Sequence, residues 1–181
     1  IGSAVVRALL ADGRAVRATL APGESPANLE GLDVERVTVD VCDRAAVAAA
    51  VRGCDVVYHL AAIYSLWLPD ESVIFRVNVE GTKNVLAAAA KAGVRRVVHT
   101  SSIAAIGVPP PGQLADERFV WNHWRGGSAY IRSKYLSDLD AQRAAADGVP
   151  VVIVCPAFPF GERDRGPTPT GRFIVEALAR R

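Results

Sequence analysis

The sequence predicts an α/β protein built on a doubly wound parallel sheet. Short apolar segments of the kind that are buried on both faces of a parallel sheet recur along the chain, for example residues 55–60. Between them lie segments, often alanine-rich, with the apolar spacing of an amphipathic helix. Strands and helices that alternate in this way form a parallel sheet with right-handed crossovers. The 181 residues contain no internal repeat or linker, so we expect one domain over residues 1–181.

Composition restricts the class of protein. With 50% hydrophobic and 22% charged residues, the chain can form one sizeable core without metals or disulfides. The net charge is only +2 and the basic residues are scattered, which argues against a nucleic-acid partner. Cys42, Cys54 and Cys155 form no Cys-x-x-Cys pair, so we expect a reducing cytoplasm and interpret all three as small buried apolar residues. Because no apolar run reaches about 18 residues, we expect no membrane span.

The first elements are a helix and a strand. Residues 2–11 have apolar side chains at helical spacing and end at Asp12-Gly13, a helix-ending signal. Residues 14–20 alternate in polarity, which predicts a strand. The chain does not begin with Met, and Gly2 reads as the inside of a motif. We therefore expect a fragment of a longer protein.

The second strand ends at an aspartate. Residues 34–41 alternate into Asp40 and are followed by an alanine-rich helix over 44–52. Side chains at the carboxyl ends of such strands face the ligand crevice. Asp40 has an equally weighted structural alternative, because an aspartate here can cap the following helix.

The third strand covers residues 55–60 and is followed by two small residues. Ala61 and Ala62 leave space for a cofactor to lie against the end of the strand. His59 stands at the end of the strand, where a lone histidine is more often a hydrogen-bonded structural residue than a catalyst. No catalytic role is assigned to it.

An aromatic loop follows over residues 63–70. It carries Tyr64, Trp67 and Pro69 at the carboxyl end of a strand, where open α/β sheets bind ligands. These side chains either form an apolar wall over a substrate or pack against the neighbouring helix. The sequence favours neither alternative.

A long helix and a further strand follow. Residues 73–92 predict a helix that ends at Gly93, and its interior Gly81 indicates a close approach between helix and sheet. Residues 94–100 predict the next strand, and Ser101 and Ser102 terminate it. Their hydroxyls are therefore placed at the ligand-binding edge of the sheet.

Tyr130 and Lys134 form the most informative pair of residues. A helix begins near Ser128, a capping residue, and residues four apart lie on one helical face. The Lys134 ammonium can therefore sit beside the Tyr130 phenol and lower its pKa from the reference value of about 10. This moves the phenol toward proton exchange with an alcohol or ketone, whose oxygen Ser102 could orient. The alternative is an exposed Tyr/Lys pair on an amphipathic helix.

The last part of the chain continues the alternation. Residues 149–155 predict a strand, Pro156 begins a rigid turn that reaches Gly161, and residues from Thr168 onward predict a helix.

Taken in order, these segments resemble the extended short-chain dehydrogenase/reductase superfamily. The resemblance is to its NAD-dependent epimerase/dehydratase and dihydroflavonol-reductase-like branch, and within it to the hopanoid-associated sugar epimerases. It spans nearly the whole chain, and the matching stretches are Ile1-Gly2, Asp40-Val41, His59 to Ala62, Asn78 to Thr82, Thr100 to Gly107, Tyr130 to Lys134 and Pro156 to Gly161.

The resemblance implies an NAD(P)-binding Rossmann domain and assigns roles to some of the matching residues. Tyr130 would be the general acid/base, Lys134 would tune it and hold the nicotinamide ribose, and Ser102 would orient the substrate oxygen. Cofactor contacts are implied for Gly2, Asp40, Val41, Leu60, Ala61, Ala62, Tyr130, Lys134 and Pro156. No metal is implied.

The family pattern also implies what surrounds the chain. Only the last glycine of the family's Gly-x-x-Gly-x-x-Gly fingerprint, Gly2, is present, so we expect a fragment that lacks the first strand and the C-terminal substrate lobe. The positions that choose between cofactors fall on Leu20 and Ala21, which are uncharged. NAD and NADP both remain open, with less than about tenfold preference expected.

The expected activity is oxidoreduction or epimerisation at a secondary alcohol or ketone of a small molecule, plausibly a nucleotide-sugar. The alternatives are a dihydroflavonol-type carbonyl reductase and a non-catalytic dinucleotide sensor on the same fold. A cytoplasmic protein that can form a homodimer is expected.

Overall fold

The computed structural model describes residues 1–65, 67–123, 126–164 and 168–179. The strands are β1 (Arg17–Leu20), β2 (Glu35–Thr38), β3 (Val56–His59), β4 (Arg96–Thr100) and β5 (Val151–Val154). The α-helices are α1 (Gly2–Ala11), α2 (Arg44–Val51), α3 (Ser72–Phe75), α4 (Gly81–Ala92), α5 (Ala129–Ala146) and α6 (Pro169–Ala179). Short helical turns are η1 (Pro26–Leu29), η2 (Arg76–Glu80) and η3 (Ile103–Ala105).

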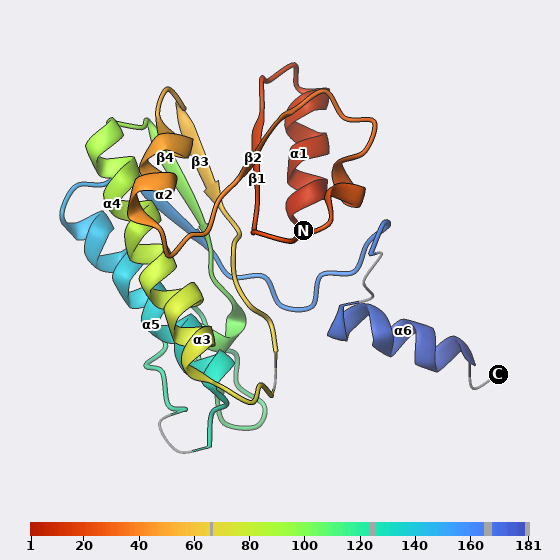
Figure 1. Cartoon of the computed structure of the whole chain (residues 1–181). Coiled ribbons are helices and arrows are strands. Elements are labelled where there is room, and N and C mark those ends of the chain that lie inside the picture. Colours follow the sequence, from red (N-terminus) through yellow and green to blue (C-terminus); the bar gives the residue numbers. More distant parts are fainter. Residues whose placement is uncertain (66, 124–125, 165–167, 180–181) are drawn as a thin grey trace.

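The strands form two parallel sheets. β1 pairs with β2, so that Arg17 lies opposite Glu35. The other sheet has the order β3-β4-β5, with Val57 opposite Val97 and Val97 opposite Val151. Within the described residues, no strand joins β1 to β3, so the two sheets are separate units (Figure 1). The predicted α/β class with parallel strands is confirmed, and the break lies where the first strand of a doubly wound sheet would run.

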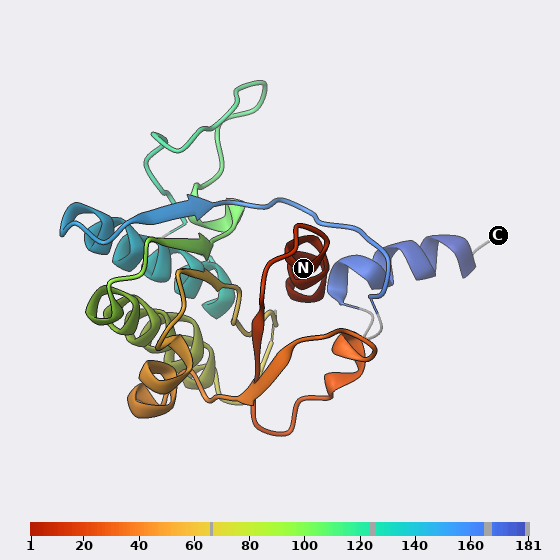
Figure 2. The same ribbon diagram turned by 90° about the horizontal axis from the view of Figure 1, so that it is seen from above.

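The main core lies between the β3–β5 sheet and the helices on one of its faces. Figure 2 shows α4 and α5 on this face and α1 on the other side of the sheet. The buried core residues are Val39, Val47, Val51, Val85, Leu86, Ala88, Ala89, Val94, Val97 and Ala141. They come from α2, α4, α5, β4 and the ends of strands, which ties α2 to the larger sheet. In contrast, α1 buries none of its residues.

The predicted helix over 73–92 is present but not uniform. It consists of α3, a π-helical turn η2 and α4 in succession. It ends at Gly93, whose φ of 66° is left-handed, as expected for a glycine that terminates a helix. A Cβ at Gly81 would lie 2.6 Å from Val41 Cγ2. The close approach is present, but its partner is Val41, which lies in the turn between β2 and α2 and not in a strand.

The three cysteines are less buried than the sequence predicted. Cys42, Cys54 and Cys155 are free thiols but only half-buried, so their interpretation as buried residues was wrong. Each stands near the end of an element, where part of the side chain faces outward.

Among the described residues, no helix is long and apolar enough to cross a bilayer.

Candidate active site

Ser102 and Tyr130 are brought together by two caps at the carboxyl ends of the strands. Ser102 follows β4, is 8% exposed and accepts a 3.2 Å hydrogen bond from the Ala104 amide at the start of η3. Ser128 accepts a 3.3 Å hydrogen bond from the Ile131 amide, which fixes the first turn of α5 as predicted. Tyr130 lies in that turn, near enough to Ser102 for the serine side chain to lower the pKa of its phenol.

The Tyr130 phenol stays protonated over a wider pH range than a free tyrosine. Burial raises its pKa, the interaction with Ser102 lowers it, and the neighbouring Tyr64 raises it again. The expected lowering by Lys134 is absent, so this part of the prediction was wrong. Two features that the sequence does not reveal explain the difference: the phenol loses hydration, and the Lys134 ammonium is directed to a backbone carbonyl.

Lys134 is almost completely buried. It is 3% exposed, and its Nζ donates a 2.9 Å hydrogen bond to the Thr100 carbonyl at the end of β4. Burial lowers its pKa to about 8, while the charge of Asp138 opposes that change. At pH 7 the ammonium form still exceeds the amine by about ten to one. The alternative of an exposed Tyr/Lys pair on a helix surface is therefore wrong.

Asn78 positions the site, although the sequence reasoning gave it no role. It is 1% exposed and lies in the π-helical turn η2. Its Oδ1 accepts from the Ile63 amide at 2.7 Å, and its Nδ2 donates to the Ile63 carbonyl at 3.0 Å and to Ser133 Oγ at 2.9 Å. Ser133 Oγ in turn donates to the Tyr130 carbonyl at 2.8 Å. The loop after β3 is thus fastened to the first turn of α5, and π-helical turns often occur at such functional positions.

An aromatic stack holds η3 against α5. The rings of Trp121 and Tyr135 are parallel, with centroids 4.0 Å apart. Trp121 Nε1 also donates a 2.9 Å hydrogen bond to the Ala104 carbonyl, two residues beyond Ser102. The backbone that carries Ser102 is therefore held in place by the helix that carries Tyr130.

His59 is a structural residue, as its position at a strand end predicted. Its Nε2 lies 2.9 Å from Thr82 Oγ1, and that hydroxyl donates its only hydrogen to the Asn78 carbonyl at 2.7 Å. His59 must therefore donate through Nε2. Burial and, as the smaller cause, the Lys134 charge together lower its pKa to about 4, so the ring is neutral at pH 7.

The aromatic loop after β3 lies over Tyr130. The Tyr64 ring is 4.8 Å from the Tyr130 ring and is 41% exposed, and Trp67 is 74% exposed. The Tyr64 ring packs on the first turn of α5 while part of it stays exposed, so neither of the two alternatives is excluded for this loop.

The predicted cofactor contacts occupy the same end of the strands but differ in exposure. Ala61 and Ala62 are exposed, whereas Leu60 and Pro156 are half-buried. Gly2 is the first residue of α1, where a Cβ would meet no atom within 4 Å.

Asp40 and Val41 form the turn between β2 and α2. Asp40 Oδ1 accepts a 2.9 Å hydrogen bond from the Cys42 amide, whereas Asp43 caps α2 through the amides of Ala45 and Ala46. The alternative interpretation of Asp40 as the helix cap is therefore wrong. Its carboxylate is exposed at the edge of the sheet.

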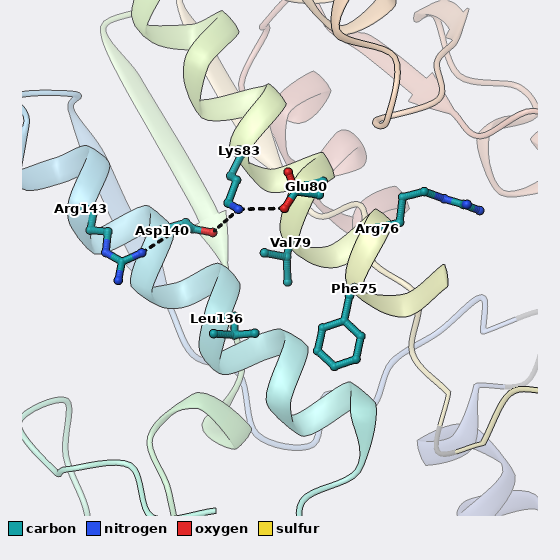
Figure 3. A pocket seen from close by; sticks show the side chains of 8 residues that line it. All are labelled: Phe75, Arg76, Val79, Glu80, Lys83, Leu136, Asp140 and Arg143. Carbon is teal, nitrogen blue, oxygen red and sulfur yellow. Dashed lines mark hydrogen bonds and ion pairs between the residues drawn. The ribbon is translucent and has the colours of Figure 1, made fainter. Parts of the chain in front are cut away.

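A separate groove lies on the outer surface between the η2–α4 helix and α5 (Figure 3). Lys83 Nζ lies in it, 2.8 Å from Glu80 Oε1 and 3.9 Å from Asp140 Oδ2, and Asp140 Oδ1 also accepts from Arg143. None of the three proposed catalytic residues lines this groove. Its charges form a solvent-exposed network of ion pairs, which is typical of an outer helix surface.

Comparison with known proteins supplies the family. The model of the NAD dependent epimerase/dehydratase family matches residues 1–181. A Synechocystis sp. protein with the provisional name dihydroflavonol 4-reductase is 43% identical over 180 residues, which cover 99% of this chain and 52% of that protein. Sterol demethylase protein B of Methylococcus capsulatus is 40% identical and matches over 97% of this chain and 53% of its own length.

A solved structure agrees with these relatives. The UDP-glucose 4-epimerase of Thermus thermophilus, crystallised with NAD, superposes with a TM-score of 0.84 at 28% identity and covers 97% of this chain and 58% of its own. The chain thus spans about half the length of the curated relatives it matches.

Proposed function

The chain belongs to the NAD-dependent epimerase/dehydratase family, and we propose that the protein of which it forms the dinucleotide-binding part is an oxidoreductase or epimerase acting on a secondary alcohol or ketone. The observation that carries this proposal is the meeting of Tyr130, Ser102 and the buried Lys134 at one end of the strands. Chemistry of this type needs one group that exchanges a proton with the reacting oxygen, in a position next to the hydride carrier.

The residues present fit a dinucleotide. Ala61 and Ala62 are small and exposed at the end of β3, so a flat ligand can approach the backbone there. The Lys134 ammonium donates to only one acceptor among the described residues, so it has hydrogens left for ribose hydroxyls. Bound NAD would accept or deliver the hydride.

Tyr130 is suited to act as the acid in the reducing direction. Its raised pKa keeps the proton on the phenol at neutral pH. When hydride reaches a carbonyl carbon, the oxygen gains negative charge and takes that proton. Ser102, whose side chain lies near enough to the phenol to lower its pKa, would orient the same oxygen. In the opposite direction the phenolate would take the proton of an alcohol.

Two substrate classes follow from the relatives. A nucleotide-sugar is supported by the structural likeness to a UDP-glucose 4-epimerase. A dihydroflavonol-type ketone is supported by the 43% identical relative and by the aromatic ring of Tyr64 beside Tyr130. An epimerase returns its bound cofactor to the starting oxidation state, whereas a reductase consumes one reduced cofactor for each product. Following cofactor absorbance during turnover therefore separates the two.

The test of the proposal is Tyr130→Phe in the full-length protein. We expect turnover to fall by about 10²–10⁴ while cofactor binding is retained, because only the proton-transferring hydroxyl is removed. Tyr58→Phe is the matched control, since Tyr58 is 40% exposed on β3 and, among the described residues, no hydrogen bond or ring contact joins it to Ser102, Tyr130 or Lys134. Full activity of Tyr130→Phe would refute the role proposed for Tyr130, whereas a wild type that binds the cofactor but turns over no substrate would favour the dinucleotide sensor.

Assembly and location complete the proposal. A homodimer in the cytoplasm remains our expectation. Leu136, which is 37% exposed beside Phe75 on the outer surface of the helices, would be part of the contact. Sedimentation of the wild type and Leu136→Lys would test it, and a monomeric wild type would contradict it.

A further inference from the structure

The face of α5 that points to the sheet carries two buried charged residues one turn apart. Lys134 is 3% exposed and Asp138 is 6% exposed. Residues at this spacing share one helical face, and the flanking Ser133 and Ser137 are fully buried and small. Two ionisable side chains are therefore held on one buried face of the helix, where a charged group loses its hydration at a cost in free energy.

One carboxylate oxygen of Asp138 has no partner. Its Oδ2 accepts a 2.5 Å hydrogen bond from Gln142 Nε2, one further turn along the helix. Its Oδ1 is buried and makes no hydrogen bond with any described residue. A buried carboxylate oxygen without a hydrogen bond destabilises the fold unless a nearby opposite charge offsets the loss of hydration.

The other groups around Lys134 carry no negative charge at neutral pH. The titratable groups that face it from each packed element are His59 on β3, His99 on β4, Cys155 after β5, and Tyr130 and Asp138 on α5. Burial lowers the pKa of His99 to about 3, as it does that of His59 to about 4, so both rings are neutral. Burial raises the pKa of Cys155 and of Tyr130, so both remain protonated. Asp138 is the only carboxylate in the set.

We propose that Asp138 is a positioning residue that acts through Lys134: its buried charge keeps the lysine in the ammonium form that a ribose requires. The use of the ammonium to bind a ribose rests on the proposed function. The effect of the Asp138 charge on the Lys134 pKa does not. No ion pair within 4.0 Å joins Lys134 to Asp138 in the described chain. The carboxylate acts through the weakly screened interior, where a unit charge is effective beyond contact distance.

The test measures the Lys134 amine directly. In the full-length protein labelled with ¹³Cε-lysine and free of cofactor and substrate, the Lys134 resonance is assigned by its loss in Lys134→Arg. In the wild type it should titrate near pH 8. Asp138→Asn should move this midpoint to lower pH by about one unit, because a negative charge that favours the ammonium is removed. Asp140→Asn is the matched control: it removes the same charge two residues away, from a side chain that faces Lys83 and Arg143, and should leave the midpoint in place.

Turnover provides the second readout. Activity that needs the ammonium falls as pH rises through the lysine midpoint, so the basic limb of the pH profile should move to lower pH by the same amount in Asp138→Asn. A merely structural role would lower activity at every pH and leave the limb in place. If Asp138→Asn does not fold, Asp138→Leu replaces it, since this variant removes both the charge and the unpartnered oxygen.

An unchanged or raised Lys134 midpoint in the Asp138 variant would overturn the proposal, as would an equal shift in Asp140→Asn. Because the amine is titrated without turnover, this result is independent of the Tyr130→Phe experiment. An active Tyr130→Phe enzyme with a shifted Lys134 midpoint would refute the proposed chemistry and leave the interaction standing.

Discussion

His59 and His99 make stability depend on pH. Their rings lie 5.4 Å apart in the core, and burial lowers their pKa values to about 4 and about 3 from 6.5. In the unfolded chain both rings bind protons as pH falls below 6.5, whereas in the folded protein they remain neutral until about pH 4 and below. Their contribution to stability is therefore complete above pH 6.5 and is lost as the pH falls through this window.

We expect the Tm of the full-length protein to fall by at least about 5 °C between pH 6.5 and 4.5. His99→Gln, which removes the more strongly shifted group, should flatten this dependence even if it lowers stability at pH 7. His123→Gln, in a loop outside the core, is the control and should retain the wild-type slope. Calorimetry at several pH values measures all three, and an equal slope in His99→Gln would contradict the assignment.

Cofactor choice depends on a residue that the sequence did not single out. Arg17, which precedes the discriminating positions, is already held by Glu35 and by the carbonyls of Ala50 and Arg52. It is therefore not free to bind a 2′-phosphate. Glu24 Oε2 accepts a 3.0 Å hydrogen bond from the Ala21 amide just beyond β1, which places a carboxylate where a ribose hydroxyl would be read.

This geometry changes the expectation of a less than about tenfold preference between NAD and NADP. A carboxylate at the end of β1 repels a 2′-phosphate, so we now expect NAD to bind more than about tenfold more tightly than NADP, a difference of about 1.4 kcal/mol or more. Glu24→Gln should narrow the ratio, whereas Asp33→Asn, an equal loss of charge at an exposed position, should not. Fluorescence titration of both cofactors tests this, and a wild type that prefers NADP would refute it.

At the scale of one element, the first residue of α4, Gly81, must lack a side chain because Val41 lies against it. A Cβ at this position would lie 2.6 Å from Val41 Cγ2 and 3.1 Å from Val41 Cβ. Gly81→Ala must therefore displace the turn between β2 and α2, at a cost of about 1–3 kcal/mol in the free energy of unfolding. Adding Val41→Ala should restore much of that loss, because it removes the overlapping methyl group. Urea denaturation of both variants measures the effect, and a single variant as stable as the wild type would contradict it.

The positions of helices and strands could be predicted from the sequence, whereas irregular turns within them and their exact ends could not. Apolar spacing located the helix over 73–92 and the cap at Ser128, because both depend on local sequence. The π-helical turn around Asn78 was not predicted, since it depends on contacts with Ile63 and Ser133, which are distant in the sequence. Strands came out shorter than expected because pairing, and not the apolar run, decides where they end.

The candidate site followed the same rule. The positions of Ser102, Tyr130 and Lys134 at one sheet edge could be predicted, because topology alone places strand ends and helix starts there. The electrostatics could not. The pKa of Tyr130 depends on how much water the phenol loses, and the Lys134 ammonium is directed by the Thr100 carbonyl. Neither quantity is set by the spacing of the two residues.

At the scale of the whole molecule, the sheet is divided between β1 and β3, and this division determines how residues 1–181 behave on their own. The edges of β1 and β3 that face the gap have no strand partner among the described residues, and α1 buries no side chain. Exposed strand edges and apolar faces favour aggregation.

We therefore expect a polypeptide of residues 1–181 alone to unfold without a sharp transition, to aggregate and to bind NAD weakly. A chimera in which a strand and glycine turn from the 43% identical relative precede Gly2 should join the two sheets and cover α1. It should unfold cooperatively and bind NAD more tightly, because a glycine turn before a helix supplies backbone amides to a pyrophosphate. Solubility, calorimetry and NAD titration of the two proteins side by side measure the difference. A soluble, cooperatively unfolding 1–181 with the cofactor affinity of the chimera would show that the gap between β1 and β3 does not limit the fold.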